Sequence, residues 1–213
     1  MVADILLQIV LFLIVVIFFL AIHDIPQKAL AKLRRRSRVN IQARRHFVAG
    51  AQLLAQARSA KSRSSVASFA KSAVEEADKA ILLDPTDAAS HILKSLALDL
   101  QGFKSSALDS LDAALSPLAA KSLGDPERAD ALFKRAELRI AVNRRGGADT
   151  AIEDLVEAVR LSKDHVKAWC LLGECYEMKK MKEEAKKAYE EAIAVEPELK
   201  VAREALDRLG LTL

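Results

Sequence analysis

The sequence predicts an all-α protein: an N-terminal transmembrane helix, then a right-handed α-solenoid of about four helix pairs, then a C-terminal capping helix. Apolar residues make up 51% of the 213 residues, but only 5% are aromatic and 29% are charged. That composition is typical of helical repeats. Apolar and polar residues nowhere alternate over the length of a strand, which argues against a β fold. Small residues also recur 34 positions apart, as do Ala80 and Ala114, and Ala158 and Ala192, and such a period indicates repeated helix pairs.

The first element is an apolar run of 18 residues, from Ile5 to Ile22, in which Gln8 is the one polar residue. A helix of that length spans about 27 Å, near the thickness of the hydrocarbon core of a bilayer. We therefore expect residues 1–25 to form a transmembrane signal-anchor that Pro26 ends or kinks. A cleaved signal peptide is the alternative, but the sequence has neither a basic N-terminal region nor a small-x-small cleavage site.

A basic juxtamembrane segment is predicted at residues 26–42. Residues 25–63 contain eleven Lys or Arg and no acid, whereas the charge is −2 over residues 1–24 and −5 over residues 64–213. By the positive-inside rule, the bulk of the chain should face the cytosol. We expect six side chains to face anionic lipid headgroups: Lys28, Lys32, Arg34, Arg35, Arg36 and Arg38. The alternative is that these charges only set the topology.

This pattern predicts a single-pass membrane protein. The long, strongly apolar span favours the endoplasmic reticulum or another endomembrane, with the outer membrane of mitochondria or plastids as the alternative. The basic tract is not expected to bind nucleic acid, because only Phe47 interrupts it, and single-strand binders use several stacking aromatic residues.

The clearest helix pair is predicted over Val166–Leu199. Small residues at two positions allow two antiparallel helices to approach closely, large residues beside them fill the remaining space, and a proline stops the second helix. The positions that carry this pattern are Trp169, Leu172, Gly173, Tyr176, Ala185, Tyr189, Ala192 and Pro197.

These residues resemble the tetratricopeptide repeat at each of its signature positions. The resemblance implies an array over residues 43–198, with repeats near 43–85, 88–121, 129–163 and 166–199, and a capping helix at 199–213. The first repeat is the most degenerate, and a plain helix followed by three repeats is its alternative. Local chemistry agrees, since Pro85–Asp87, Gly124–Pro126 and Ser162–Asp164 each supply an N-cap residue.

No catalytic, cofactor-binding or metal-ligating site is predicted. The four His residues have no ligand spacing, and neither a phosphate-binding glycine loop nor a nucleophile motif occurs. Cys170 and Cys175 are expected to be core or free thiols. We therefore expect a protein that is not an enzyme and needs no cofactor.

In the family that the sequence resembles, the first helix of each pair lines a concave groove that binds extended peptides or partner helices. The matching positions give seven candidate groove residues: Asp99, Phe133, Lys134, Glu137, Lys167, Glu174 and Glu177. Phe47, Leu96 and Asp130 occupy further groove-facing positions. Because acids outnumber bases, a partner with a basic or mixed-charge segment is favoured.

The predicted function is thus a membrane-anchored, cytosol-facing adaptor for protein–protein interaction. The alternatives are a structural subunit of a membrane complex and an organelle-surface receptor for chaperones or precursor proteins. Family members that hold the acidic C-terminus of cytosolic chaperones use two Asn residues, a Lys and an Arg at set positions. Those positions hold Ala51, Leu93, Asp130 and Lys134 here, and only the last is compatible.

Overall fold

The computed structural model describes residues 2–143 and 146–210, and within its first helix the side chains of residues 5–19 and 39–59. In this part of the chain there are nine α-helices and one short 3-10 helix, with no strand. The elements are α1 (Val2–Ser59), α2 (Arg63–Leu83), α3 (Ala88–Leu100), α4 (Lys104–Ala114), η1 (Ala119–Ser122), α5 (Asp125–Val142), α6 (Gly147–Leu161), α7 (Val166–Met178), α8 (Lys182–Val195) and α9 (Lys200–Arg208).

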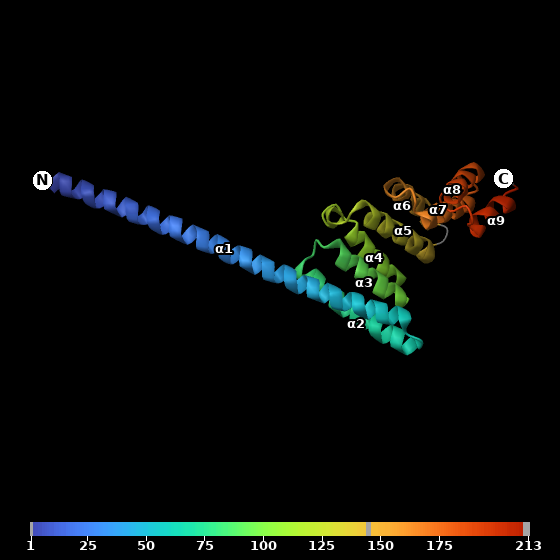
Figure 1. Ribbon diagram of the computed structural model, residues 1–213, viewed down its shortest axis with the longest axis horizontal. Helices are drawn as coiled ribbons and strands as arrows, with labels where there is room; N and C mark the ends of the chain where they lie inside the picture. The colour runs from blue at the N-terminus through green and yellow to red at the C-terminus, as the bar shows by residue number, and fades with distance from the viewer. Residues whose placement is uncertain (1, 144–145, 211–213) are drawn as a thin grey trace.

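The helices pack as consecutive pairs into an all-α solenoid, as predicted. The pairs are α1–α2, α3–α4, α5–α6 and α7–α8, and α9 packs on α8 at the end of the array. Figure 1 shows the N-terminal part of α1 projecting away from this array. The helix enters the packed body near Ala43, which is the first buried residue along the described part of the chain.

Fully buried alanines recur throughout the array. Eight of them recur at equivalent places in the four pairs, and each has 0% of its surface exposed: Ala73, Ala80, Ala107, Ala114, Ala151, Ala158, Ala185 and Ala192. A methyl group is small enough to let two helix backbones approach, and it loses no side-chain entropy on burial. The low aromatic content of the sequence follows from this way of packing.

Side-chain caps fix where several helices begin. Asp87 caps α3 by accepting a hydrogen bond from the amide of Ser90, whereas Gly124 occupies the N-cap position of α5 without a side-chain cap. At α7 the cap is His165, whose Nδ1 accepts from the amide of Ala168 at 3.1 Å, so the predicted segment Ser162–Asp164 ends one residue too early. This shift places an imidazole at the start of α7.

The predicted N-terminal transmembrane helix is contradicted. Among the residues whose side chains the structure describes, no helix combines the length and the apolarity that crossing a membrane requires. The same finding overturns the single-pass membrane localisation.

The flank of that segment also differs from expectation in its backbone. Helix α1 runs without a break through Pro26, where the sequence suggested an end or a kink. The side chains of residues 20–38 lie outside the described part of the structure. The predicted lipid contacts of Lys28, Lys32, Arg34, Arg35, Arg36 and Arg38 all fall in that range.

Candidate partner-binding groove

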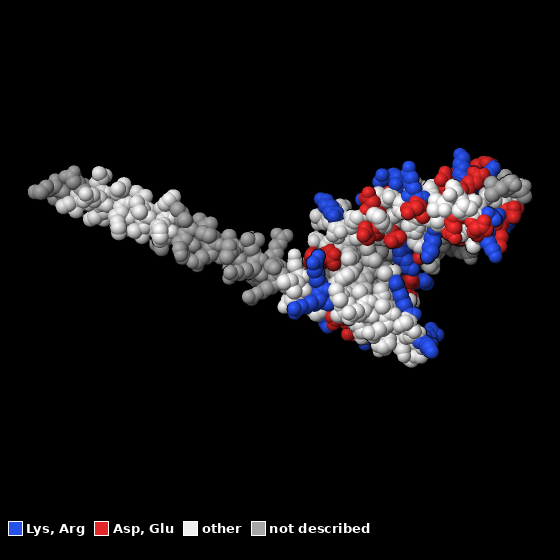
Figure 2. All heavy atoms as spheres, in the orientation of Figure 1, with Lys and Arg blue, Asp and Glu red and all other residues white. Residues whose placement is uncertain are grey.

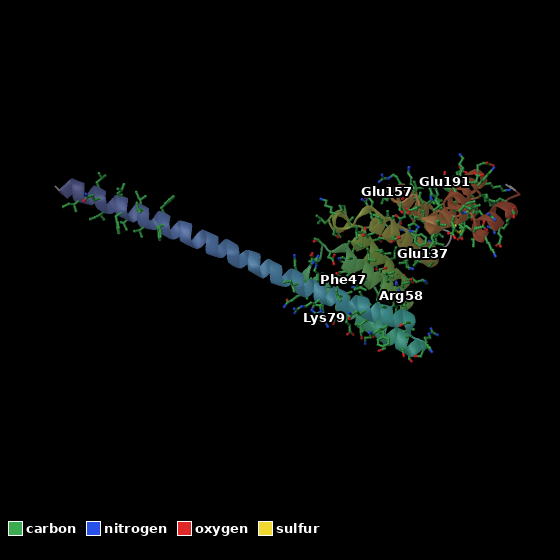
Figure 3. All side chains as sticks on the ribbon, viewed as in Figure 1. Phe47, Arg58, Lys79, Glu137, Glu157 and Glu191 are labelled. Atoms are coloured by element: carbon green, nitrogen blue, oxygen red, sulfur yellow. The ribbon has the colours of Figure 1, made fainter. Side chains whose placement is uncertain are left out.

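The first helices of the four pairs line two adjoining cavities. The acidic cavity, of about 740 Å³, lies against α5, α7 and the start of α9. The apolar cavity, of about 520 Å³, lies against α1, α3 and α5. Asp130 and Phe133 of α5 line both, so the two cavities form one groove that α5 divides. Figure 3 shows Phe47 on α1 and Glu137 on α5, which border the two sections.

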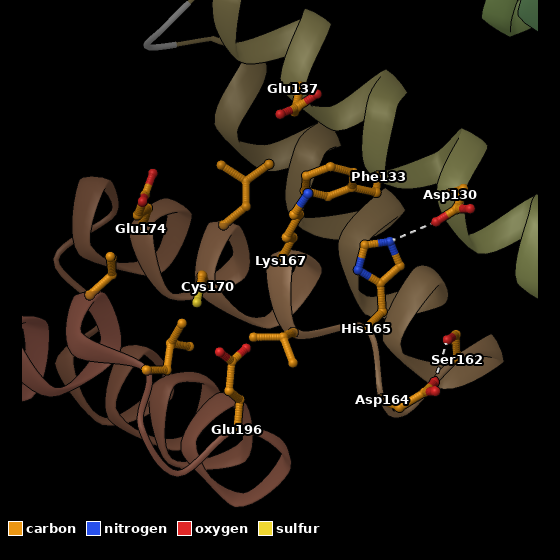
Figure 4. A pocket seen from close by; sticks show the side chains of 14 residues that line it. Asp130, Phe133, Glu137, Ser162, Asp164, His165, Lys167, Cys170, Glu174 and Glu196 are labelled. Atoms are coloured by element: carbon orange, nitrogen blue, oxygen red, sulfur yellow. Dashed lines mark hydrogen bonds and ion pairs between the residues drawn. The ribbon is translucent and has the colours of Figure 1, made fainter.

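Carboxylates dominate the charge of the acidic cavity. Five acids and one lysine line it, and Figure 4 shows them around the opening: Asp130, Glu137, Asp164, Glu174, Glu196 and Lys167. Its remaining wall includes Val166, Leu171, Leu199 and Val201. In the described part of the chain, Glu174, Glu196 and Lys167 form no ion pair, so two carboxylates there are available to a ligand.

Burial and charge set the protonation of two acids in this cavity. Burial of the Glu174 carboxyl and the nearby carboxylate of Glu177 raise the pKa of Glu174, against the opposing effect of Arg208. A hydrogen bond from Ser162 lowers the pKa of Asp164, with the hydroxyl donating over 2.7 Å. Of these two acids, Glu174 is therefore the one whose charge is more easily lost as the pH falls.

The seven predicted groove residues separate into three groups. Phe133, Glu137, Lys167 and Glu174 line the acidic cavity, and Lys134 lines the apolar cavity beside Phe133. Asp99 and Glu177 line neither. The structure thus brings four of the seven into one place and gives the other three partners within the protein.

Lys134 is held by two carboxylates of its own chain. Its Nζ lies 2.9 Å from Asp99 Oδ2 and 3.1 Å from Glu137 Oε2, and Asp99 also pairs with Lys104 at 3.2 Å. Burial opposes the charge of Asp99, but Lys134 and Lys104 outweigh it and lower its pKa. The ammonium of Lys134 is therefore a poor receptor for an acidic ligand.

Glu177 connects the last three helices. Its Oε1 accepts a hydrogen bond of 2.6 Å from the hydroxyl of Tyr189 on α8 and one of 2.8 Å from Arg208 on α9. Burial, together with this contact, raises the pKa of Tyr189. The carboxylate thus fixes the capping helix to the fourth pair instead of facing the groove.

His165 is a groove residue that the sequence did not indicate. Its ring packs on Phe133 with 5.0 Å between the centroids, and its Nε2 lies 3.0 Å from Asp130 Oδ1 without the alignment of a hydrogen bond. Because Nδ1 accepts from the amide of Ala168, we assign the proton of the neutral ring to Nε2, facing Asp130. His165 therefore connects the start of α7 to α5 at the boundary between the cavities.

The cysteine thiols lack the properties of nucleophiles. Cys170 borders the acidic cavity, and burial raises its pKa, as do the charges of Glu174 and Glu196. Burial raises the pKa of Cys175 to about 12. A thiol attacks as its thiolate, and a raised pKa disfavours the thiolate of both side chains.

The comparisons with known proteins agree with this architecture. The family model for the tetratricopeptide repeat matches residues 166–199, the helix pair α7–α8. The chain therefore contains a tetratricopeptide repeat there, and its solenoid has the fold of tetratricopeptide-repeat structures. No curated protein is found as a relative of the sequence.

Three solved structures illustrate the similarity. The MamA protein is 17% identical with a TM-score of 0.60, over 80% of this chain and 84% of that one. TTC0263, a thermophilic TPR protein in Thermus thermophilus, is 18% identical with a TM-score of 0.54, over 79% and 81%. The first TPR of Spaghetti (RPAP3), bound to the HSP90 peptide SRMEEVD, is 23% identical with a TM-score of 0.50, over 60% and 93%. At these identities the likeness extends to the fold.

Proposed function

We propose that this protein is a non-enzymatic interaction adaptor that holds an extended segment of a partner protein across the groove, with basic side chains of that segment in the acidic cavity. The observation that carries the proposal is the excess of five carboxylates over one ammonium around that cavity. A guanidinium or ammonium group entering there meets the unpaired Glu174 and Glu196. Complementary charge of this kind sets partner choice and association rate.

The chemistry of the groove distinguishes this ligand from an acidic one. The peptide in the Spaghetti structure, SRMEEVD, carries three acids. Lys134 is the one residue here at a position that holds acidic tails in chaperone-binding family members. It is already held by Asp99 and Glu137, and the nearby Asp130 adds a negative charge. A receptor for acidic chaperone tails is therefore disfavoured.

We further propose that the array extends over residues 43–198 as four repeats, with residues 199–213 as the cap. The small residue of the first helix supports this assignment in each pair, because Gly50, Ser95, Ala136 and Gly173 are all buried. A Cβ at Gly50 would lie 2.9 Å from Leu93 of the next pair. The end of α1 is thus packed as closely as the later first helices.

Charge reversal in the acidic cavity should abolish the preference for basic peptides. We expect Glu137→Lys with Glu174→Lys, in the full chain, to weaken binding of a labelled 12-residue Gly/Ser peptide carrying two Arg by about tenfold or more, or 1.4 kcal/mol per tenfold step. Fluorescence anisotropy measures this. Wild-type protein should bind the same peptide with Glu in place of Arg, or SRMEEVD, much more weakly.

The matched control is Glu153→Lys with Glu191→Lys. Both side chains are exposed, on α6 and α8 respectively, and Glu191 is labelled in Figure 3. The two double variants have the same net charge, so equal weakening in both would show attraction to the whole protein and not to a groove. Glu177 is left unchanged because its reversal would release Tyr189 and Arg208.

Binding of the Arg peptide should weaken as the pH is lowered from 7 to 5. The pKa of Glu174 lies above the ordinary 4.5 because of its burial and the charge of Glu177, despite Arg208. The Glu174 carboxylate therefore takes up its proton at a higher pH than an ordinary glutamate does, and its attraction for Arg is lost at that higher pH. Glu174→Gln should bind less tightly at pH 7 and lose less on acidification. If the affinity for the Arg peptide changes with pH in the same way in both proteins, Glu174 does not contribute to the binding site.

A further inference from the structure

We infer that the partner segment is bipartite, with an apolar side chain for the apolar cavity and a basic side chain for the acidic cavity, about six residues apart. This inference rests on the proposed function and names the ligand that the whole groove selects. The acidic cavity by itself would accept any basic sequence. The apolar cavity beside it adds a second requirement.

The apolar cavity is built mainly from carbon. Phe47 and Ala51 of α1, Ala89, Ile92 and Leu96 of α3, and Phe133 of α5 contribute to its wall. Its volume of about 520 Å³ lies within the range of pockets that enclose a ligand. Figure 2 shows the charged side chains gathered over the C-terminal pairs, while the surface over α1 and α3 is mostly uncharged in this view. The two ends of the groove thus differ in chemistry.

The two cavities are continuous, so one ligand can occupy both. Asp130 and Phe133 belong to both walls, and Lys134 at the apolar wall is neutralised within the chain by Asp99 and Glu137. An apolar side chain seated near α3 therefore meets no unpaired cation, and the same segment continues over Phe133 toward Glu174. His165 keeps this passage in place by its contact with Phe133.

The fold sets the spacing between the two anchors. The apolar section is centred on α3 and the acidic section on α7, with α5 between them. Directly packed helices lie about 8–10 Å apart, and α5 packs more closely on α4 and α6 than on α3 and α7, so the anchors are separated by at least roughly 16–20 Å. An extended chain covers about 3.3 Å per residue, which gives roughly five or six residues.

A second copy of this chain is the competing occupant. The exposed apolar stretch Ile5–Phe19 could offer apolar side chains, but it contains no Lys or Arg. It could fill the apolar section, and basic residues follow it in the sequence from Lys28 onward. The basic residues up to Arg58 lie on the same unbroken helix as the apolar stretch, whereas the groove is proposed to hold an extended segment. The extended form of the ligand therefore favours a separate partner segment with both kinds of side chain.

The test uses four labelled Gly/Ser peptides and the full chain. One carries two Leu and, six residues later, two Arg; one carries only the Leu pair; one only the Arg pair; and one has both pairs two residues apart. Burial of a leucine corresponds to about ten- to a hundredfold in affinity. We expect the long bipartite peptide to bind at least about tenfold more tightly than the Arg peptide, and the short one to lose that advantage.

Ala89→Gln fills the apolar cavity without changing charge, and Ala67→Gln on the exposed face of α2 is its matched control. Ala89→Gln should remove the gain from leucine and leave binding of the Arg peptide unchanged. If the Arg and bipartite peptides bind equally and Ala89→Gln has no effect, the bipartite ligand is refuted while the proposed function stands. If Glu137→Lys with Glu174→Lys also changes nothing, both are refuted. Self-association that Ala89→Gln abolishes would assign the cavity to a second copy.

Discussion

Asp154→Ala should lower the free energy of unfolding by about 3 kcal/mol, because it leaves two partly buried guanidinium groups without their main partner. Asp154 lies on α6 and is 4% exposed. Its Oδ2 accepts from Arg135 Nε at 2.9 Å and from Arg139 Nη1 at 2.8 Å, while Oδ1 accepts from Arg135 Nη2 at 2.5 Å. Loss of one partner from a buried pair costs about 3–5 kcal/mol. The lower value applies because Asp112 still contacts Arg135 at 3.0 Å.

Urea unfolding followed by circular dichroism measures this effect, and the midpoint of thermal unfolding should fall by roughly 6–12 °C. Asp109→Ala, at an exposed position on α4, should change stability by less than about 0.5 kcal/mol. Asp154→Leu combined with Arg135→Met and Arg139→Met removes the charges together and should recover most of the loss. A single Asp154→Ala variant as stable as the control would contradict the role of this cluster.

Gly173→Leu should destabilise the fourth helix pair by about 1–3 kcal/mol or more through overpacking. Even a Cβ at Gly173 would lie 2.6 Å from Cζ and 2.7 Å from Cε1 of Tyr189. That ring is 1% exposed, and its hydroxyl is fixed to Glu177, so it has no room to move. Because Glu177 also holds Arg208, displacement of the ring should loosen α9 as well, which hydrogen exchange of its amides would reveal.

The alanine variant separates packing from helix propensity. Alanine is favoured over glycine inside a helix by about 1 kcal/mol, so propensity alone predicts that Gly173→Ala is stabilising. The contact with Tyr189 predicts the opposite. In a Tyr189→Leu background the clash is absent, and Gly173→Ala should then be neutral or stabilising. The same loss in both backgrounds would show that the ring is not the cause.

The packing of the fourth pair could be predicted from the sequence because each signature residue has one physical task. Gly173, Tyr189 and Ala192 are spaced so that small and large side chains meet between two helices, and the structure places all three in buried contacts. The 34-residue period of alanines likewise indicates the all-α solenoid. These features depend on local spacing, which a sequence displays directly.

The buried charges could not be predicted in this way. Asp154 resembles any acid on a helix amid basic residues, and its burial follows from where α5 and α6 meet. The spacing of Glu177 after Glu174 on α7 predicts a groove residue, but its carboxylate points to Tyr189 and Arg208. Contacts between helices that are distant in the sequence determine where these carboxylates point. A local sequence pattern does not contain that information.

The apolar cavity and the role of His165 also have no clear sequence signal. Half-buried alanines such as Ala51 and Ala89 have no sequence pattern that distinguishes a cavity wall from a helix contact. His165 follows Asp164, a better N-cap residue by statistics, so the sequence predicts the cap one position earlier. The one available signal for His165 is its position directly before Val166, at the start of the clearest repeat.

Helix α1 both lines the groove and projects beyond the packed array. The same unbroken helix that supplies Phe47 and Ala51 to the apolar cavity extends outward from Ala43 to Val2, a distance of about 60 Å at 1.5 Å per residue. Figure 1 shows no joint between the two parts. A helix is stiff along its axis, so a tilt of the outer end acts as a lever on the wall of the groove. A partner that binds the outer end of α1 would therefore orient the groove. Force applied to that end would reach the apolar cavity before the acidic cavity, because α1 lines the apolar cavity.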